Sequence, residues 1–261
     1  AVPIKGDKNF EKLRSKINLD RTLNLTSDFD LHPALENFKS CWDQNTASVF
    51  HATSIPYKER SHFEGQNLMM TGGRVPYKDK TGWLGRGMKL AGLSGNGLAL
   101  SLPMPLLIRG VPANDNYYPI RATLPHRDLL DIMQQEFDKY SEKELSETLS
   151  RIKKRKVSRN TSKKNSALAL EAGKMLSDPN GPRVAVFEVE EFDTHAAQGG
   201  VHGTHADCLR EYDNILKGLK ISLGSAFKDT LILTLTEFGR TIKQNGGNGT
   251  EHGYVTAVLM A

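Results

Sequence analysis

The chain has 261 residues, of which 38% are hydrophobic and 25% are charged, so it can form one large α/β domain or two small ones. It contains no apolar run close to the roughly 20 residues of a membrane-spanning helix, so no membrane span is expected. The net charge is +5, but eight basic residues and no acidic ones lie within 151–164, and the rest of the chain carries −3. We therefore interpret this basic run as a solvated loop or helix face, and nucleic acid is not an expected partner.

The first half of the chain predicts alternating helices and strands: a helix at 31–42, a short buried strand at 47–53, a helix from 61 to about 71–73, a helix from 82 and a strand at 105–110. Ser61 and Glu64 have the spacing of a capping box, which is typical of a helix start.

The second half begins with a helical pattern, interrupted by the basic run, and we interpret about 125–180 as a helical basic insertion. The elements that follow are a strand at 183–190, a helix at 203–223, a strand at 229–236 and a last strand at 254–260. A strand, helix and strand in this order predict a right-handed βαβ unit and a largely parallel sheet. No repeat or linker divides the chain, which favours a single domain over 1–261.

The ends of the chain and its two cysteines give further expectations. The chain opens without a Met or a signal peptide and stops inside an apolar run, so we expect a fragment cut at both ends. Cys41 and Cys208 lack metal-type spacing, and they form either a disulfide or two buried thiols, of which buried thiols are favoured.

Carboxylate and imidazole side chains follow successive predicted strands. Asp193 and His195 come just after the strand at 183–190, Glu237 ends the next strand, and His252 follows a Gly- and Asn-rich loop flexible enough to bring it back over the sheet edge. Ligands of open α/β sheets bind outside the carboxyl ends of the strands. Such mixed ligands suit Zn²⁺, Mn²⁺ or iron and not Ca²⁺. The alternative is that the carboxylates cap helices and the histidines are surface groups.

Ser61 is the candidate nucleophile. At a helix start its hydroxyl lies beside free backbone N–H groups, which also attract phosphate or sulfate. A bound metal would lower the pKa of this hydroxyl, and the neighbouring Arg60 and His62 could supply charge to an oxyanion. The alternative is a serine that only caps the helix.

Several short motifs together resemble a known family: Leu31–Leu35, Arg60–Gln66 with Thr71 and Gly72, Gly82–Arg86, Phe192–Gln198, Thr236–Thr241 and Gly249–Gly253. The series resembles an uncharacterised bacterial family of sulfatase-like proteins, a domain of unknown function in the alkaline phosphatase superfamily, whose members are typically exported by the twin-arginine route. The resemblance implies a three-layer α/β/α sandwich with one or two divalent ions, zinc or manganese, at the carboxyl edge of the sheet.

The resemblance also implies roles for residues and a cellular location. Ser61 resembles the superfamily nucleophile, Asp193 and His195 a metal-binding pair, Glu237 the next carboxylate and His252 the late histidine. A periplasmic or otherwise exported protein is implied. Phe238 departs from the pattern, because many superfamily members have a histidine there.

Two functions follow as expectations. The first is a metal-dependent hydrolase-like protein whose partner is a small anionic ester, a phosphate or sulfate ester or a related anion. The second is a non-catalytic exported binding or assembly protein that retains the sulfatase-like fold. The presence of Phe238 where many superfamily members have a histidine favours this second function. The sequence leaves the oligomeric state open.

Overall fold

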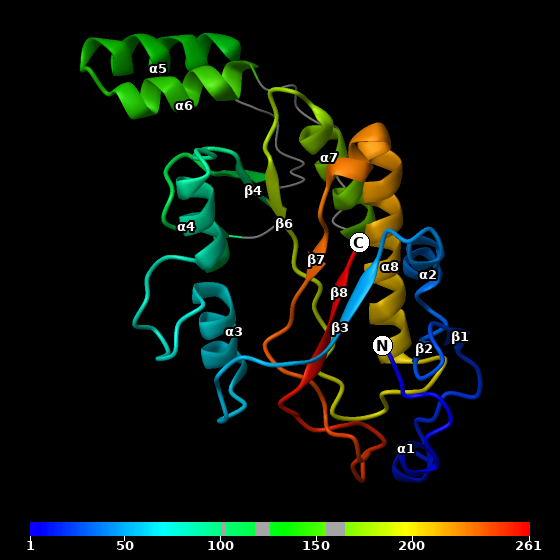
Figure 1. Ribbon diagram of the computed structural model, residues 1–261. Helices are drawn as coiled ribbons and strands as arrows, with labels where there is room; N and C mark the ends of the chain where they lie inside the picture. The colour runs from blue at the N-terminus through cyan, green and yellow to red at the C-terminus, as the bar shows by residue number, and fades with distance from the viewer. Residues whose placement is uncertain (101–102, 118–125, 155–164) are drawn as a thin grey trace. The chain divides into compact units, whose positions relative to one another are not determined.

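The computed structural model describes residues 1–100, 103–117, 126–154 and 165–261. The chain divides into two compact units, the first comprising Ala1–Tyr117 and Lys164–Ala261 and the second Tyr118–Lys163. Helices accompany both parallel and antiparallel sheets (Figure 1), so the α/β class expected from the sequence is confirmed.

The first unit contains most of the regular structure. Its helices are α1 (Lys8–Leu13), α2 (Glu36–Asp43), α3 (His62–Thr71), α4 (Trp83–Leu90), α7 (Asn165–Ser177) and α8 (Thr204–Leu223), with the 3₁₀ helices η1 (Leu106–Ile108) and η2 (Gly224–Asp229). Its strands are β1 (Leu23–Asn24), β2 (Asp30–Leu31), β3 (Ser48–Thr53), β4 (Gly97–Leu100), β5 (Asp115–Tyr117), β6 (Val184–Val186), β7 (Leu233–Thr234) and β8 (Thr256–Met260).

The strands form one parallel and two antiparallel sheets. The parallel sheet has the order β5-β4-β6, and Leu98 lies opposite Asp115 on one side and Ala185 on the other. The second sheet has the order β3-β8-β7 and is antiparallel, and β1 pairs with β2.

The expected parallel pairing of 183–190 with 229–236 is therefore wrong, because β7 pairs with β8. The ladder of β6 stops at Val186, before Glu188 and Glu190. Phe187 and Val189 still pack against the apolar core, and the two glutamates project from the other side of the chain. Extending the sheet there would bury both carboxylates, which is costly for unpaired charges.

Three other expectations are corrected. The segment at 105–110 contains the 3₁₀ helix η1 instead of a strand. The segment at 47–53 is a strand, β3, but an exposed one, because β3 lies at a sheet edge and leaves Phe50 49% exposed. The helix expected at 31–42 begins only at Glu36, because Asp30 and Leu31 pair with β1.

Residue His32 explains why the chain does not turn into a helix at 31. Its Nδ1 accepts the N–H of Ala34 at 3.1 Å, and its Nε2 donates to the carbonyl of Gly200 at 3.1 Å. The side chain is 3% exposed, and burial lowers its pKa to about 4, so the neutral ring matches both contacts. His32 therefore attaches this turn to the loop before α8.

Helix α8 packs against α2 and α7 in the first unit (Figure 1). On one side Leu209, Tyr212 and Leu216 meet α2 and β8, and on another side Ile215 and Leu219 meet the parallel sheet and α7. The other face of the parallel sheet packs against α4 and η1. Glycine permits the close approach of α7, since a Cβ at Gly173 would lie 1.8 Å from Oγ of Ser222.

Cys41 and Cys208 are both free and buried, which confirms the favoured interpretation of buried thiols.

Asp213 of α8 caps helix α2. Its carboxylate accepts the backbone N–H groups of Asn37 and Phe38 at 2.8 and 2.9 Å, and Nδ2 of Asn37 at 2.7 Å. The N-cap residue Leu35 has no side chain that could serve these donors. One buried carboxylate therefore ties the two helices together.

We expect Asp213→Ala to lower the free energy of unfolding by about 3 kcal/mol, because three donors lose their acceptor. Chemical denaturation measures the change. The matched control is Asp207→Ala on the same helix, where an exposed carboxylate pairs with Arg210, and its effect should stay within about 0.5 kcal/mol. Equal losses in the two variants would contradict the capping role.

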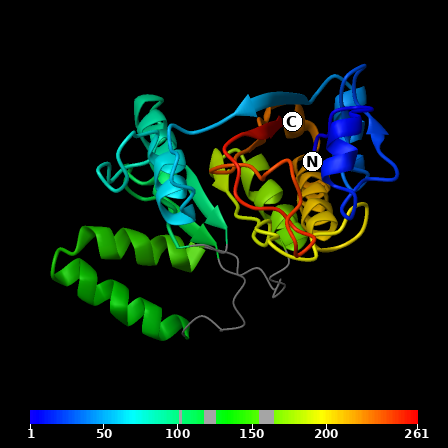
Figure 2. The same ribbon diagram turned by 90° about the horizontal axis from the view of Figure 1, so that it is seen from below.

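The second unit contains a helical hairpin of α5 (Arg127–Lys139) and α6 (Lys143–Lys154), seen in Figure 2. Gln134 of α5 hydrogen-bonds to Ser146 of α6, and Asp131 pairs with Lys153. The segment predicted as an insertion thus contributes α5 and α6 to this unit and α7 to the first. Residues 155–164 of the predicted basic run lie outside the described residues.

No described helix combines the length and apolar character needed to cross a membrane.

Candidate metal centre

Three histidines and one aspartate converge in the first unit. His62 is the first residue of α3, Asp193 and His195 lie in the loop between β6 and α8, and His252 precedes β8. Nε2 of His252 lies 3.0 Å from Nε2 of His62 and 3.0 Å from Nε2 of His195. Oδ1 of Asp193 lies 2.9 Å from Nε2 of His195 and 3.0 Å from that of His252, and Oδ2 lies 3.2 Å from Nε2 of His62.

The other ring nitrogen of each histidine faces an atom that can only accept a hydrogen bond. Nδ1 of His62 lies 2.6 Å from Oε1 of Glu237, and Nδ1 of His195 lies 3.0 Å from Oε2 of Glu251. Nδ1 of His252 lies 2.9 Å from the carbonyl oxygen of Arg60. Each contact places the proton of a neutral ring on Nδ1, which leaves Nε2 with a free lone pair.

The result is a cluster of lone pairs that face one another. Three unprotonated nitrogens and a carboxylate at these distances repel unless a cation lies among them. The separations are close to the edge of about 3.3 Å expected for a tetrahedron of nitrogen and oxygen ligands around zinc. Metal-binding histidines also usually donate Nδ1–H to a carboxylate or carbonyl, as all three do here. His62, Asp193 and His252 form a group that could hold a metal ion, with donor atoms within 4.8 Å of one another.

Arg240 and Thr250 orient Asp193. The guanidinium of Arg240 donates to Oδ1 of Asp193, to the carbonyl of Thr250 and, through Nε at 3.0 Å, to the Thr250 hydroxyl. Burial alone would raise the pKa of Asp193, but the hydrogen bond and the positive charge of Arg240 outweigh it, and the pKa is lowered. Asp193 is therefore held ionised, as a metal ligand must be.

The Gly- and Asn-rich loop is organised around Asn245. Its Oδ1 accepts the N–H groups of Gly247 and Gly249 at 3.0 Å each, and its Nδ2 donates to the carbonyl of His195 at 2.8 Å and to Glu251. This last hydrogen bond is the largest cause of the lowered pKa of Glu251. The loop thus holds the backbone of His195 and the carboxylate that contacts its ring.

Glu237 lies on the outer side of His62. The residue is 8% exposed, its Oε1 contacts Nδ1 of His62 and accepts Nε2 of Gln66 at 3.3 Å, and its Oε2 accepts the Thr236 hydroxyl at 3.2 Å. Helix α3 approaches Glu237 closely at Gly65, where a Cβ would lie 3.2 Å from Cβ of Glu237. The carboxylate thus orients a ring whose Nε2 faces the cluster.

Phe238 packs against two of the histidines. Its ring centroid lies 4.8 Å from that of His62 and 4.9 Å from that of His252, and the residue is 8% exposed. The side chain therefore fills an apolar position directly behind the cluster and offers no ligand atom.

Ser61 and Arg60 adjoin the cluster through His62 and His252. Ser61 is the N-cap of α3, where the sequence predicts the helix start, but its hydroxyl forms no capping hydrogen bond, and the predicted capping box is absent. Glu64, the expected partner, accepts the Tyr57 hydroxyl instead. Arg60 adopts a left-handed backbone conformation with φ of 60°, and its carbonyl contacts His252.

The structure thus brings together Asp193, His195 and His252, three of the four predicted metal ligands, and adds His62, which the sequence suggested as a catalytic residue. The site residues predicted from the sequence did not include Arg240, Asn245 or Glu251. Arg240 and Glu251 lie within the Thr236–Thr241 and Gly249–Gly253 motifs, and Asn245 directly precedes the loop glycines. These positions are the sequence signal that could have indicated a role for them.

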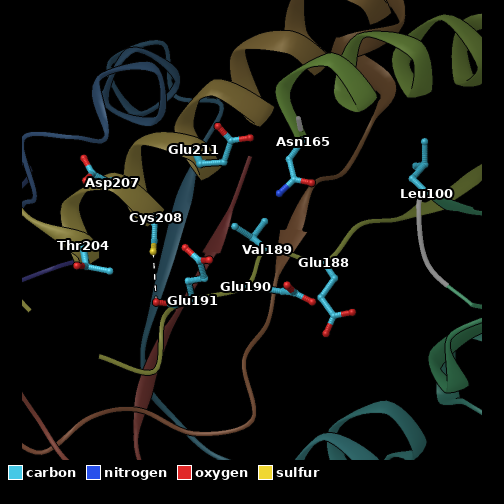
Figure 3. Close-up of a pocket in the computed structure, with 10 residues that line it drawn as sticks. All are labelled: Leu100, Asn165, Glu188, Val189, Glu190, Glu191, Thr204, Asp207, Cys208 and Glu211. Carbon is cyan, nitrogen blue, oxygen red and sulfur yellow. Dashed lines mark hydrogen bonds between the residues drawn. The ribbon is translucent and has the colours of Figure 1, made fainter. Parts of the chain in front are cut away.

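A separate cavity of about 490 Å³ lies between the segment after β6, the start of α7 and α8 (Figure 3). Five carboxylates line it: Glu188, Glu190, Glu191, Asp207 and Glu211. Sγ of Cys208 donates to the carbonyl of Glu191 at 3.3 Å. Burial, together with the charges of Glu190 and Glu237, raises the pKa of Glu188. No residue of the histidine cluster lines this cavity.

The fold and the cluster define a mixed α/β protein with a candidate histidine-rich metal centre. The chain belongs to the family described as "Protein of unknown function (DUF1501)", whose model matches residues 120–261. That match includes Asp193, His195, Glu237 and His252. No curated protein matches the sequence.

One solved structure is similar, the C-terminal periplasmic domain of EcEptC from Escherichia coli in complex with Zn. It is 12% identical, the alignment covers 94% of this chain and 70% of that one, and the TM-score is 0.39.

Proposed function

We propose that this protein is a metal-dependent hydrolase-like protein that acts on a phosphate or sulfate ester or a related anion. One observation carries the proposal: three histidines with Nδ1 bound to acceptors turn their Nε2 lone pairs toward one another and toward an ionised aspartate. The proposed ligands are His62, Asp193, His195 and His252, and zinc or manganese suits this donor set. Glu237, predicted as a ligand, is proposed to orient His62.

The wider assignment follows the resemblance. We propose a single alkaline phosphatase-like domain with a three-layer sandwich, in a protein that is periplasmic or otherwise exported. The parallel sheet, with α7 and α8 on one face and α4 on the other, supports the layered arrangement.

In this proposal the ion, when bound, polarises an ester oxygen and lowers the pKa of a nearby hydroxyl. The residues of the chain supply the rest. Ser61 at the start of α3 is the nucleophile, beside backbone N–H groups that favour an anion. Arg60 supplies positive charge to the oxyanion, and Glu237, Glu251 and the Arg60 carbonyl keep the three rings in their metal-binding tautomer.

Hydrolysis of chromogenic phosphate and sulfate esters by the zinc- or manganese-loaded protein tests the proposal. We expect Ser61→Ala to lower kcat by about 100-fold or more with metal content unchanged, because the nucleophile is lost. The exposed Ser54→Ala is the matched control and should retain full activity. Turnover by Ser61→Ala equal to that of the wild type would remove Ser61 from catalysis.

Phe238 favours a second candidate function. Where many superfamily members have a histidine, its ring packs on His62 and His252, so the site has ligands for one ion in the proposed arrangement. A non-catalytic exported binding or assembly protein would retain the fold and this ion. Bound metal without turnover of any phosphate or sulfate ester would support this function over hydrolysis.

A further inference from the structure

The side chain of Arg60 has no polar partner among the described residues. Its Nε is buried without a hydrogen bond, and its guanidinium forms no ion pair within the described part of the chain. The guanidinium carbon instead lies 4.2 Å from the centroid of the Tyr254 ring. A buried N–H group without an acceptor is costly, so we expect this side chain to bind a partner that the described part of the chain does not provide.

The position of Arg60 connects it to the cluster. It precedes Ser61 and His62, its carbonyl contacts His252, and Tyr254 follows His252 by two residues. The other arginine at the cluster, Arg240, is engaged by Asp193 and Thr250. Arg60 is therefore the arginine beside the cluster that remains available to a ligand.

We propose that Arg60 and Tyr254 form the anion-binding element of this site, with the guanidinium as donor to a tetrahedral oxyanion and Tyr254 as its positioning residue. The planar guanidinium offers parallel N–H groups that match two oxygens of a phosphate or sulfate. The aromatic face holds the cation in place and reduces the ordering cost of binding. This anion-binding element deepens the proposed function and rests on it for the assignment of an ester as substrate. Binding of the anion itself requires no turnover.

The backbone of Arg60 makes a clean test possible. Its φ of 60° is disfavoured for arginine and accessible to glycine without strain. Arg60→Gly should therefore keep the carbonyl that contacts His252 while it removes the side chain with its guanidinium. A change in metal content would show that the contact between the Arg60 carbonyl and His252 is lost. A change in anion affinity at constant metal content would show the effect of removing the guanidinium.

The experiment is calorimetric titration of sulfate and of inorganic phosphate into the metal-loaded protein, with metal content measured in parallel. We expect Arg60→Gly to weaken anion binding by about 10-fold or more at unchanged metal content. Tyr254→Leu should weaken it by about 3-fold, and Tyr254→Phe, which keeps the ring face, should bind as the wild type does. Arg21→Gly, which removes an exposed positive charge elsewhere in the chain, is the control.

Wild-type protein that binds neither anion, or Arg60→Gly that binds them as the wild type does, would overturn the proposal. Equal affinities in Tyr254→Leu and Tyr254→Phe would overturn the role of Tyr254. The same titrations in metal-free protein separate this inference from the proposed function. Absence of metal from the wild type would count against the hydrolase, whereas anion binding that still depends on Arg60 would support the anion-binding element by itself.

Discussion

Substitution of His252 by alanine is expected to abolish stoichiometric metal binding. Nε2 of His252 lies next to both other imidazoles and Asp193, so its loss removes the central donor of the cluster. Removal of residues that only orient ligands already costs 10- to 100-fold in affinity, and we expect a loss of at least about 100-fold here. Elemental analysis after equilibration with zinc or manganese measures the bound ion.

The matched control is His202→Ala, which removes an exposed histidine from the loop just before α8. It should retain the wild-type metal content. Circular dichroism of both variants establishes that the fold is intact. Full metal occupancy in folded His252→Ala would rule out the cluster as the metal site, and equal losses in both variants would point to binding outside it.

Substitution of Gly249 by alanine is expected to have the second large effect. A Cβ at Gly249 would lie 2.3 Å from the carbonyl carbon of His195 and 2.4 Å from its oxygen, closer than any real Cβ contact. The backbone that holds His195 must therefore shift, together with the hydrogen bond from Gly249 to Asn245. We expect stability to fall by about 2 kcal/mol or more and metal content to fall with it.

Gly246→Ala provides the control within the same loop. A Cβ at Gly246 meets nothing within 4 Å, so metal content and the unfolding midpoint should match those of the wild type. Thermal unfolding with elemental analysis covers both readouts. Loss of metal from both variants would mean that loop flexibility, and not the close approach of Gly249 to His195, controls the site.

Local patterns predicted the helices well and the sheets poorly. Helix α8 begins and ends within a residue of the expected 203–223, because apolar periodicity and a flanking glycine at each end are local signals. The start of α3 was also predicted, although the hydroxyl of Ser61 forms no capping bond. The pairing of β7 with β8 was missed, because apolar runs specify a strand but not its partner.

The sequence by itself determined the α/β class and the kinds of side chain that follow the strands, and it predicted four candidate ligands, Asp193, His195, Glu237 and His252. Only the tertiary structure decided which atoms face one another. The contacts of His62 with His252 and Glu237 span 190 and 175 residues, and no local pattern encodes the direction of a ring across such a distance. The chemistry of the cluster depends on that direction, because the acceptor at each Nδ1 determines whether Nε2 carries a proton or a free lone pair.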